Sequence, residues 1–243
     1  REEQTRRERN PYMDAVGEEH TDQEAESPGL FTRYFQVFVS PDVLFQGLRT
    51  RPDYVGALLL GGGLTAAALA LIPSDLILAT LREGLQAQGQ AVPPQLENFG
   101  AVIRFAGPVA AFVFWPLGMA FFAGLVTLFF AILLGHEGTY RQYLAVVAHA
   151  QLIVATAGIL LAPMRIAAED AQLLLSIGTF ATFLEEGYIL RFLSLLDLFG
   201  LWAWVLVALG AARIARKRSW LGGLIFVLMI PVTTAAVVAL FSG

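Results

Sequence analysis

The sequence predicts an all-α, polytopic membrane protein: a five-transmembrane-helix bundle preceded by amphipathic helices at the membrane interface. Hydrophobic residues make up 56% of the 243 residues and charged residues only 15%, whereas soluble domains carry about a quarter charged residues. The mean hydropathy is +0.63. The apolar residues gather in runs of the length, about 20 residues, that crosses a bilayer core of about 30 Å.

Residues 1–29 form a charged arm with almost no aliphatic side chains. Such a segment cannot bury enough apolar surface to offset the entropy lost on ordering, so we expect a disordered cytoplasmic arm. Its polarity also argues against a signal peptide. The net charge of −4 leaves no basic face for nucleic acid. The chain has no cysteine, which excludes disulfides and thiolate metal sites.

Residues 30–52 predict two short interfacial helices. Aromatic residues recur at i, i+3, i+4 and i+7 in the first of them: Phe31, Tyr34, Phe35 and Phe38. Arg33 and Gln36 fall on the opposite face, a pattern typical of a helix lying in the membrane interface. Ser40 and Pro41 predict the start of the second helix, with the Ser40 hydroxyl as its cap. We expect these aromatics, together with Phe45, to offer a surface for the interface or a partner.

Residues 53–243 contain the predicted spans, at about 54–72, 105–135, 143–162, 192–212 and 220–241. The second is long and contains Pro108 and Pro116, so we expect a tilt or a kink. Residues 171–184 are apolar but short and flanked by acids, which predicts an interfacial or partly buried helix rather than a sixth span.

The positive residues predict the orientation. Seven arginines precede the first span, and Arg141 and the basic group at 213–218 fall on the same side, whereas Arg82, Arg104, Arg165 and Arg191 fall on the other. Lys and Arg concentrate in cytoplasmic connections. We therefore expect a bacterial inner-membrane protein with a cytoplasmic N-terminus and its C-terminus on the opposite side.

Small residues four positions apart predict close helix contacts, because helices in lipid associate through residues that let backbones approach. The pairs are Ala57 with Gly61, Gly62 with Ala66, Ala120 with Gly124, and Gly158 with Ala162. Packing within the chain is the main interpretation, and dimerisation is the alternative.

Three polar side chains fall within the predicted spans, where each needs a reason to be present. His149 and Gln151 lie in the third span and Asp197 in the fourth. Counting about 1.5 Å per residue from opposite ends of the core leaves His149 and Asp197 roughly 13 Å apart, too far for a shared proton relay or metal site. They either satisfy neighbouring groups in the bundle or line a polar path.

Two further patterns resemble reactive sites. In Gly135-His136-Glu137-Gly138-Thr139, one His beside one Glu is too small a set for a metal, and the glycines favour a tight turn. Glu185 and Glu186 are adjacent, so on a helix they diverge and favour a solvated face. The sequence shows no nucleophile with a base. We therefore expect no catalytic residues, no cofactor and no metal.

Two segments resemble the Yip1 domain family. One runs from Phe38 through Pro41, Phe45 and Leu48 to Pro52, before the first span, and the other is Leu195-Leu196-Asp197-Leu198-Phe199-Gly200-Leu201-Trp202. The chain departs from the family at residues 148–151, which no proline follows until Pro163. The resemblance implies five helices and a cytoplasmic N-terminus. Eukaryotic members act in vesicle trafficking with small GTPases, and most bacterial members have no assigned activity.

Two functions follow as hypotheses. The first is a non-catalytic scaffold or accessory subunit of a membrane assembly, in contact with the lipid bilayer and with other membrane proteins or a second copy of itself. The second is a small transporter, channel or lipid-handling protein, in which His149, Gln151 and Asp197 line a path. A membrane-embedded hydrolase is the weakest alternative.

Overall fold

The computed structural model describes residues 28–135, 137–216 and 221–241. The helices are α2 (Leu30–Val39), α3 (Pro41–Thr50), α4 (Val55–Leu71), α5 (Ser74–Ala87), α6 (Gly100–Thr127), α7 (Tyr140–Ala150), α8 (Leu152–Ala167), α9 (Tyr188–Ser194), α10 (Leu198–Ile214) and α11 (Leu221–Phe241). Two 3₁₀ turns, Pro94–Phe99 and Gly178–Phe180, and a π-helical turn, Leu128–Leu133, join them. The predicted all-α class is confirmed for this part of the chain. Most of the predicted arm, residues 1–27, lies outside it.

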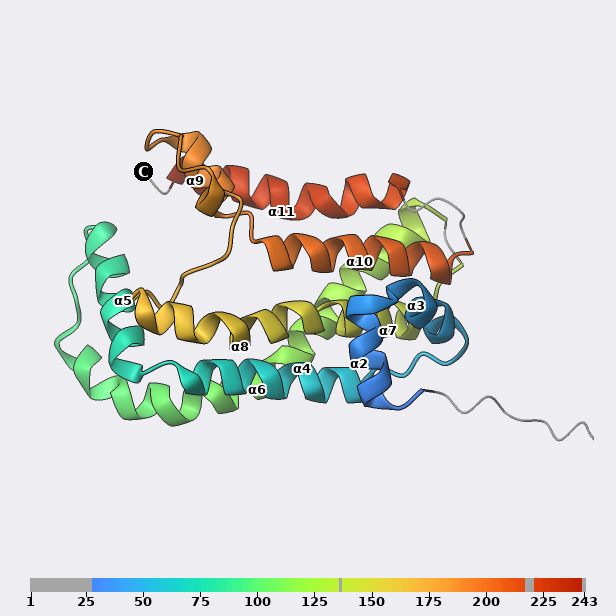
Figure 1. Ribbon diagram of the computed structural model, residues 1–243, viewed down its shortest axis with the longest axis horizontal. Coiled ribbons are helices and arrows are strands. Elements are labelled where there is room, and N and C mark those ends of the chain that lie inside the picture. The colour runs from blue at the N-terminus through green and yellow to red at the C-terminus, as the bar shows by residue number, and fades with distance from the viewer. Residues whose placement is uncertain (1–27, 136, 217–220, 242–243) are drawn as a thin grey trace, which may run out of the picture.

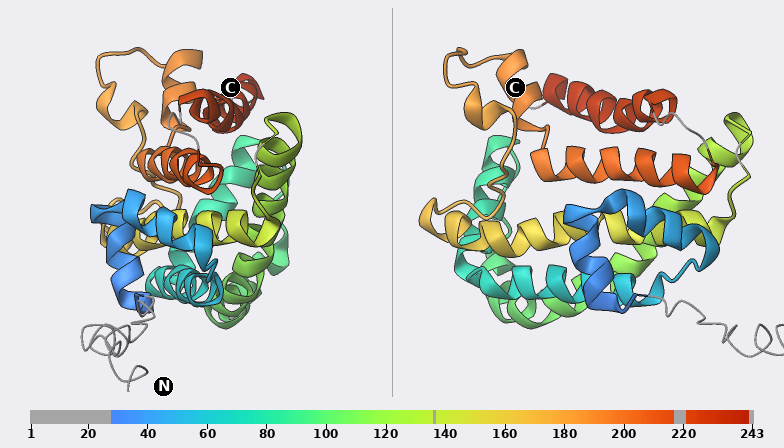
Figure 2. Two further views of the ribbon diagram at one scale, coloured as in Figure 1. Left: turned by 90° about the vertical axis from the view of Figure 1, so that its right-hand side faces the viewer. Right: turned by 45° about the vertical axis from the view of Figure 1, so that its right-hand side comes forward.

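Helices α4, α8, α10 and α11 run along one axis (Figure 1). Helices α4, α8 and α10 lie side by side, α11 lies along the outer side of α10, and α6 crosses the bundle at an angle (Figure 2). Helices α2 and α3 lie at one end of the bundle and α5 and α9 at the other, with α2 crossing the long helices steeply. The structure therefore has two distinct ends, one of which carries the N-terminal helices.

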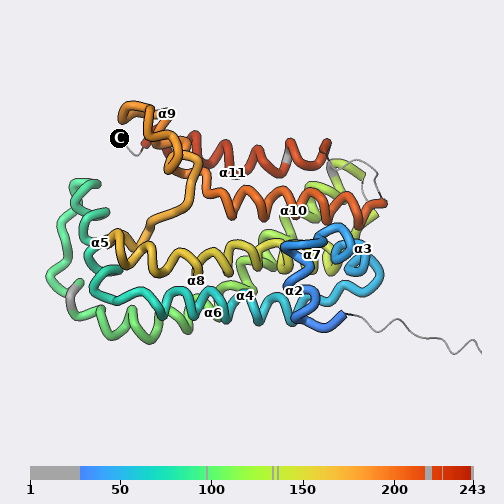
Figure 3. The backbone as a smooth tube through the Cα atoms, in the orientation of Figure 1, coloured from blue at the N-terminus to red at the C-terminus, as the bar shows by residue number. Residues whose placement is uncertain are grey.

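Helices of sufficient length and apolarity to cross a membrane cover Gly100–Ile132, Tyr140–Ala167 and Leu221–Phe241 in the described residues. Helices α4 and α5 form a pair bent by 86°, which would add a fourth span (Figure 3). Helix α10 is apolar but has 17 residues, a rise of about 26 Å against a core of about 30 Å. The count of five spans therefore stays a prediction.

Glycines let α4 approach its neighbours. A Cβ on Gly61 would lie 2.5 Å from the indole nitrogen of Trp115 on α6, and one on Gly62 would lie 3.1 Å from a backbone carbonyl of the same helix. A Cβ on Gly158 of α8 would lie 3.1 Å from that of Ala68. Three of the predicted small-residue pairs thus contain a glycine at a contact within the chain, whereas Gly124 has nothing within 4 Å.

Helix α7 is the centre of the fold. Thr139 and Gln142 form a capping box at its start, and every residue from Tyr143 to Ala150 is buried. Helix α6, which contains Pro108 and Pro116, is the opposite case. Only 17% of its most apolar stretch is buried inside the protein, against 67% for the α7–α8 span. The core therefore forms around α7, while α6 leaves most of its apolar surface open.

Two predicted helix positions are wrong. Residues 171–184 form turns and the short 3₁₀ segment Gly178–Phe180, held by hydrogen bonds between the Ser176 and Thr179 side chains and backbones. The fourth predicted span begins at Leu198 and not at Phe192, because α9 ends at Ser194 and the chain turns before α10. Apolar composition predicted helix in both places, but local side-chain hydrogen bonds compete with helix formation.

Candidate functional site

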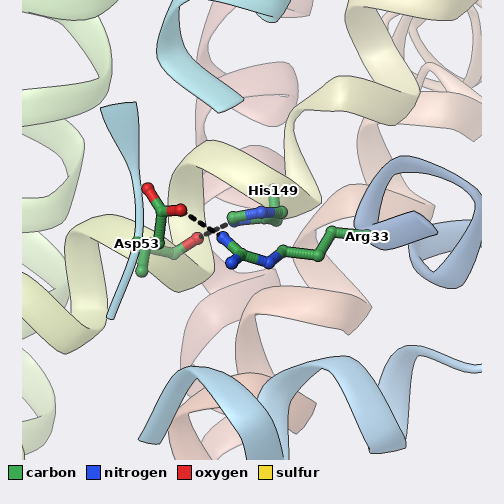
Figure 4. Close-up of polar contacts among 4 residues, drawn as sticks. Arg33, Asp53 and His149 are labelled. Atoms are coloured by element: carbon green, nitrogen blue, oxygen red, sulfur yellow. Dashed lines mark hydrogen bonds and ion pairs between the residues drawn. The ribbon is translucent and has the colours of Figure 1, made fainter. Parts of the chain in front are cut away.

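A cluster of charged and polar side chains lies where α2 crosses the bundle. Arg33 of α2 is 7% exposed, and its Nη1 donates to Oδ2 of Asp53, just before α4, over 2.5 Å. His149 of α7, which is fully buried, lies beside the guanidinium of Arg33 (Figure 4). Three segments far apart in the sequence therefore meet through polar groups.

Helix α2 is oriented differently from the prediction. Arg33 and Val37, at i and i+4, face the bundle and are buried, whereas Phe31 and Phe35 are 75% and 61% exposed. The sequence pattern had placed Arg33 on the outer, polar face. The difference has a physical reason, since a buried guanidinium is tolerated when a carboxylate pairs with it, and Asp53 supplies that carboxylate.

His149 is held by its own helix. Its Nδ1 lies 2.8 Å from the carbonyl oxygen of Ala145, and because a carbonyl can only accept, Nδ1 is the donor and Nε2 is left with a lone pair. That Nε2 is buried and has no hydrogen-bond partner among the described residues. Gln151, two residues on, is partly exposed and lies at the junction of α7 and α8.

Asp197 belongs to a different part of the molecule. It caps the start of α10, where its Oδ2 accepts from the backbone N–H of Gly200 over 2.6 Å. The charged neighbour of Asp197 is Arg165, whereas those of His149 are Arg33 and Asp53. The structure therefore does not bring His149 and Asp197 together, and Asp197 serves as a helix cap.

The five aromatics predicted as a contact surface divide into three groups. Tyr34 and Phe38 pack on the bundle: the Tyr34 hydroxyl lies 3.0 Å from that of Thr156, and the Phe38 ring lies 5.8 Å from Trp202. Phe31 and Phe35 are exposed. The prediction that Phe45 lies on the surface is wrong, because it is fully buried with Leu44 and Leu48 on the inner face of α3.

Ser40 also differs from the prediction. The helices do break there and α3 begins at Pro41, but the Ser40 side chain makes no capping hydrogen bond. The first turn of α3 contains a carboxylate, Asp42, which pairs with Arg213 of α10.

Two further predicted patterns can be compared with the structure. Of the Gly135–Thr139 segment, His136 lies outside the described residues; Gly135 has a φ of +62°, which fits the predicted tight turn. Glu185 and Glu186 are exposed.

Sequence reasoning missed the ion pairs of Arg33 with Asp53 and of Asp42 with Arg213. A signal was present, because an arginine inside an aromatic stripe needs a partner, and the acids nearest to it in an apolar context are Asp42 and Asp53. Which acid pairs with which arginine depends on the fold.

Among the described residues, no group of three or more His, Cys, Asp or Glu side chains could hold a metal ion.

Comparison with known proteins gives one family. The model of the Yip1 domain matches residues 35–242. The chain belongs to the Yip1 domain family. It is similar to "Membrane protein YknW" of Bacillus subtilis (strain 168), with 25% identity over 240 residues that cover 95% of this chain and 96% of YknW. No solved structure matches it.

The two segments that resemble the Yip1 domain family touch one another. Phe38 and Trp202 belong to different segments and their rings meet edge to face, and the side chain of Asp42 in the first segment pairs with Arg213 near the end of α10. These two contacts join the N-terminal helices to α10, which is a structural role.

The contact between Tyr34 and Thr156 allows a test of how α2 is held. Thr156 donates its hydroxyl hydrogen to the carbonyl of Leu152, so Tyr34 is the donor to Thr156. We expect Tyr34→Phe to lower the free energy of unfolding by about 1 kcal/mol. In the Thr156→Val background the same change should have almost no effect, because the acceptor is gone. Unfolding in mixed detergent micelles measures the effect of Tyr34→Phe in each background. An equal loss in the two backgrounds would contradict the hydrogen bond from Tyr34 to Thr156.

Proposed function

We propose that this Yip1-family membrane protein is a non-catalytic scaffold or accessory subunit that binds another membrane protein, or a second copy of itself, through α6. The observation that carries the proposal is a stripe of exposed apolar residues along α6 and the π-helical turn. We name it the α6 stripe: Phe114, Leu117, Phe121, Leu125, Leu128 and Ile132, each 40–72% exposed. Their spacing of three or four residues keeps them on one face.

Small residues flank the α6 stripe. Gly118 lies along one edge and Gly124 along the other, and neither has an atom of another part of the chain within 4 Å of its Cβ position. Lipid tails alone need no such openings, whereas a second helix approaches most closely where side chains are small. The combination of large apolar residues with open glycines supports a contact with another transmembrane helix.

The polar cluster supports a structural role in preference to catalysis or polar transport. Arg33 is paired with Asp53, and Nδ1 of His149 is bonded to its own helix. Asp197 caps α10. None of these groups faces a nucleophile in the described residues. Of the groups that sequence analysis placed along a path, His149 is thus bonded within α7 and Asp197 within α10, which supports a structural role.

The proposal includes the orientation of the chain. The end that carries α2 and α3 has Arg33, Arg49, Arg51, Arg141, Arg213 and Arg216, and the other end has Arg82, Arg104, Arg165 and Arg191. With the arginines of the arm and the 217–218 pair, this supports a cytoplasmic N-terminus. The topology that we propose has five crossings of a bacterial inner membrane. The arm at residues 1–29 and the interfacial helices at 30–52 lie on the cytoplasmic side, and the C-terminus lies on the opposite side.

Enlarging the flanking glycines tests the scaffold role. Since their Cβ positions are open, Gly118→Leu and Gly124→Leu should leave the folded chain intact and exclude a second helix. We expect the native assembly, extracted in mild detergent, to fall to the size of the single chain in detergent on size-exclusion chromatography. Gly63→Leu on α4, whose Cβ position is also open, is the matched control and should keep the assembly. Wild-type protein that elutes as a single chain would contradict the proposal.

A second candidate function is lipid handling. A pocket of about 310 Å³ lies among α6, α10 and α11 and has an almost wholly apolar lining that includes Phe122, Trp204, Val227 and Ile230. Such a lining favours an acyl chain over a polar solute. Lipid scrambling by the protein in liposomes, abolished when Val227→Trp fills the pocket, is the expected result for this function.

A further inference from the structure

Large apolar side chains are exposed on α9 and on the turns before it, at the end of the bundle opposite the N-terminal helices. Phe180 is 64% exposed, Phe183 82% and Ile189 62%. We call these three residues the α9 patch. Helix α9 contacts the 3₁₀ turn that ends at Phe180, so the patch belongs to one compact segment. Exposed apolar side chains that gather on a surface mark a site of interaction.

The contact between α9 and α11 sets the depth of α9 in the membrane. The Tyr188 hydroxyl donates to the carbonyl oxygen of Ala236 over 3.2 Å, and Figure 1 shows α9 beside the C-terminal turns of α11. Helix α11 has 21 residues and none of them is charged. Its length of about 32 Å covers the whole bilayer core of about 30 Å. Ala236 lies about 8 Å before the last residue of α11, Phe241, so α9 reaches the level of the acyl chains.

The backbone before α9 limits how deep the rest of the segment lies. Residues 181–187 form turns and bends, and irregular backbone is not found against acyl chains, because its N–H and C=O groups would lack partners there. Glu185 and Glu186 are exposed in this stretch, and a carboxylate is expensive in the bilayer core. The turns therefore fit the headgroup layer, from which the side chains of Phe180 and Phe183 are long enough to reach the acyl chains.

Gly187 connects the two levels. Its φ of 173° and ψ of −176° are extended, and an extended chain advances about 3.3 Å per residue. The two steps from Glu186 to Tyr188 therefore cover about 7 Å, enough to join the headgroup layer to the level of Ala236. Arg191, the charged residue of α9, is compatible with this depth because the stem of an arginine can carry its guanidinium out to the headgroups.

The surface of α11 around this contact favours lipid as the neighbour of the α9 patch. After Ala236, the helix exposes Val237, Leu240 and Phe241, by 54%, 65% and 83%. A helix that crosses a membrane turns such side chains to the acyl chains. Since α9 is packed on the same turns of α11, its own exposed side chains face the same surroundings.

We propose that the α9 patch anchors the protein in the lipid leaflet opposite the N-terminal helices. Phe180 and Phe183 insert among the acyl chains from the headgroup layer, Ile189 lies deeper beside α11, and the two glutamates stay in water. This anchor goes beyond the proposed scaffold function and depends on neither α6 nor a partner protein.

Spin labelling tests the anchor directly, because the chain contains no cysteine. A nitroxide is attached to Phe183→Cys, Ile189→Cys or Glu186→Cys, one at a time, in the full chain reconstituted in phosphatidylcholine vesicles. Oxygen collides with labels among acyl chains, and a water-soluble nickel complex collides with labels in water. We expect the ratio of oxygen to nickel collisions to be severalfold higher at Phe183 than at Glu186, the matched control from the same turn, and highest at Ile189. All three side chains are exposed, so each variant should keep the thermal midpoint.

Two results would overturn the proposal. A ratio at Phe183 equal to that at Glu186 would place the turn in water. Low collision rates of both reagents at Phe183 and Ile189 would mean that protein covers the patch. If Phe183→Cys lowers the thermal midpoint, Phe180→Cys carries the same test with the same expected ratio. Repeating the labels in the Gly124→Leu background separates the anchor from the α6 contact, because the ratios should stay unchanged there; a fall to the value of Glu186 would show that the assembly holds the patch and would also overturn the proposal.

Discussion

Asp53→Ala will destabilise the folded protein by about 2 kcal/mol, and adding Arg33→Met to it will restore most of the loss. Removing one partner of a fully buried ion pair costs about 3–5 kcal/mol, because the other charge stays buried without compensation. Here the side chain of Arg33 is 9% exposed but that of Asp53 is 51% exposed, so water reaches the pair and reduces the cost. Methionine removes the stranded charge and keeps a long side chain between α2 and His149.

The ion pair of Asp42 with Arg213 is the matched control. Its side chains are 44% and 28% exposed, so Asp42→Ala should cost at most about 1 kcal/mol. Reversible unfolding in mixed micelles gives the free energies of unfolding of the wild type, Asp53→Ala, the double variant and Asp42→Ala. The interpretation of Arg33 and Asp53 as a structural pair fails if the double variant is less stable than Asp53→Ala alone.

Gly61→Leu will separate α4 from α6, at a cost of about 3 kcal/mol. The first atom of the new side chain would lie 2.5 Å from Nε1 and 2.8 Å from Cε2 of Trp115, well inside van der Waals contact. The indole nitrogen is buried, so the ring has little room to move away. Gly63→Leu, one half-turn along the same helix, meets nothing within 4 Å and should change the free energy of unfolding by less than about 0.5 kcal/mol.

Trp115→Ala provides the rescue. Combined with Gly61→Leu it should recover part of the lost stability, because the leucine fills space that the indole leaves. Reversible unfolding in mixed micelles compares the wild type, Gly61→Leu, Gly63→Leu and the double variant. If Gly61→Leu and Gly63→Leu prove equally stable, α4 and α6 are not in close contact.

The helical class and the approximate place of most long helices could be predicted because apolar runs bounded by polar residues are a local signal. Pro73 as the stop of the first long helix and the break before Pro41 are local signals of the same kind. The turn that replaces a helix at 171–184 could not be predicted fully in this way, because Ser176 also pairs with Asp197 at the start of α10, and no local pattern reveals that contact.

The candidate site was harder to predict than the fold. His149 was identified as a polar group needing a partner, and the structure supplies Ala145 from its own helix. Arg33 was assigned to the outer face because periodicity shows which residues share a face but not which face is buried. When both faces of a helix carry large side chains, as in α2, only tertiary partners such as Asp53 and Thr156 decide its rotation.

The docking of α2 and α3 has a consequence for synthesis of the chain. Their partners include Thr156, Trp202 and Arg213. Helices α2 and α3 are therefore synthesised well before α10, which they contact. Contacts of such long sequence separation form slowly, because a large loop must close first. Until α10 leaves the ribosome, Phe38 and Asp42 lack their partners Trp202 and Arg213, and the insertion machinery and proteases can reach them.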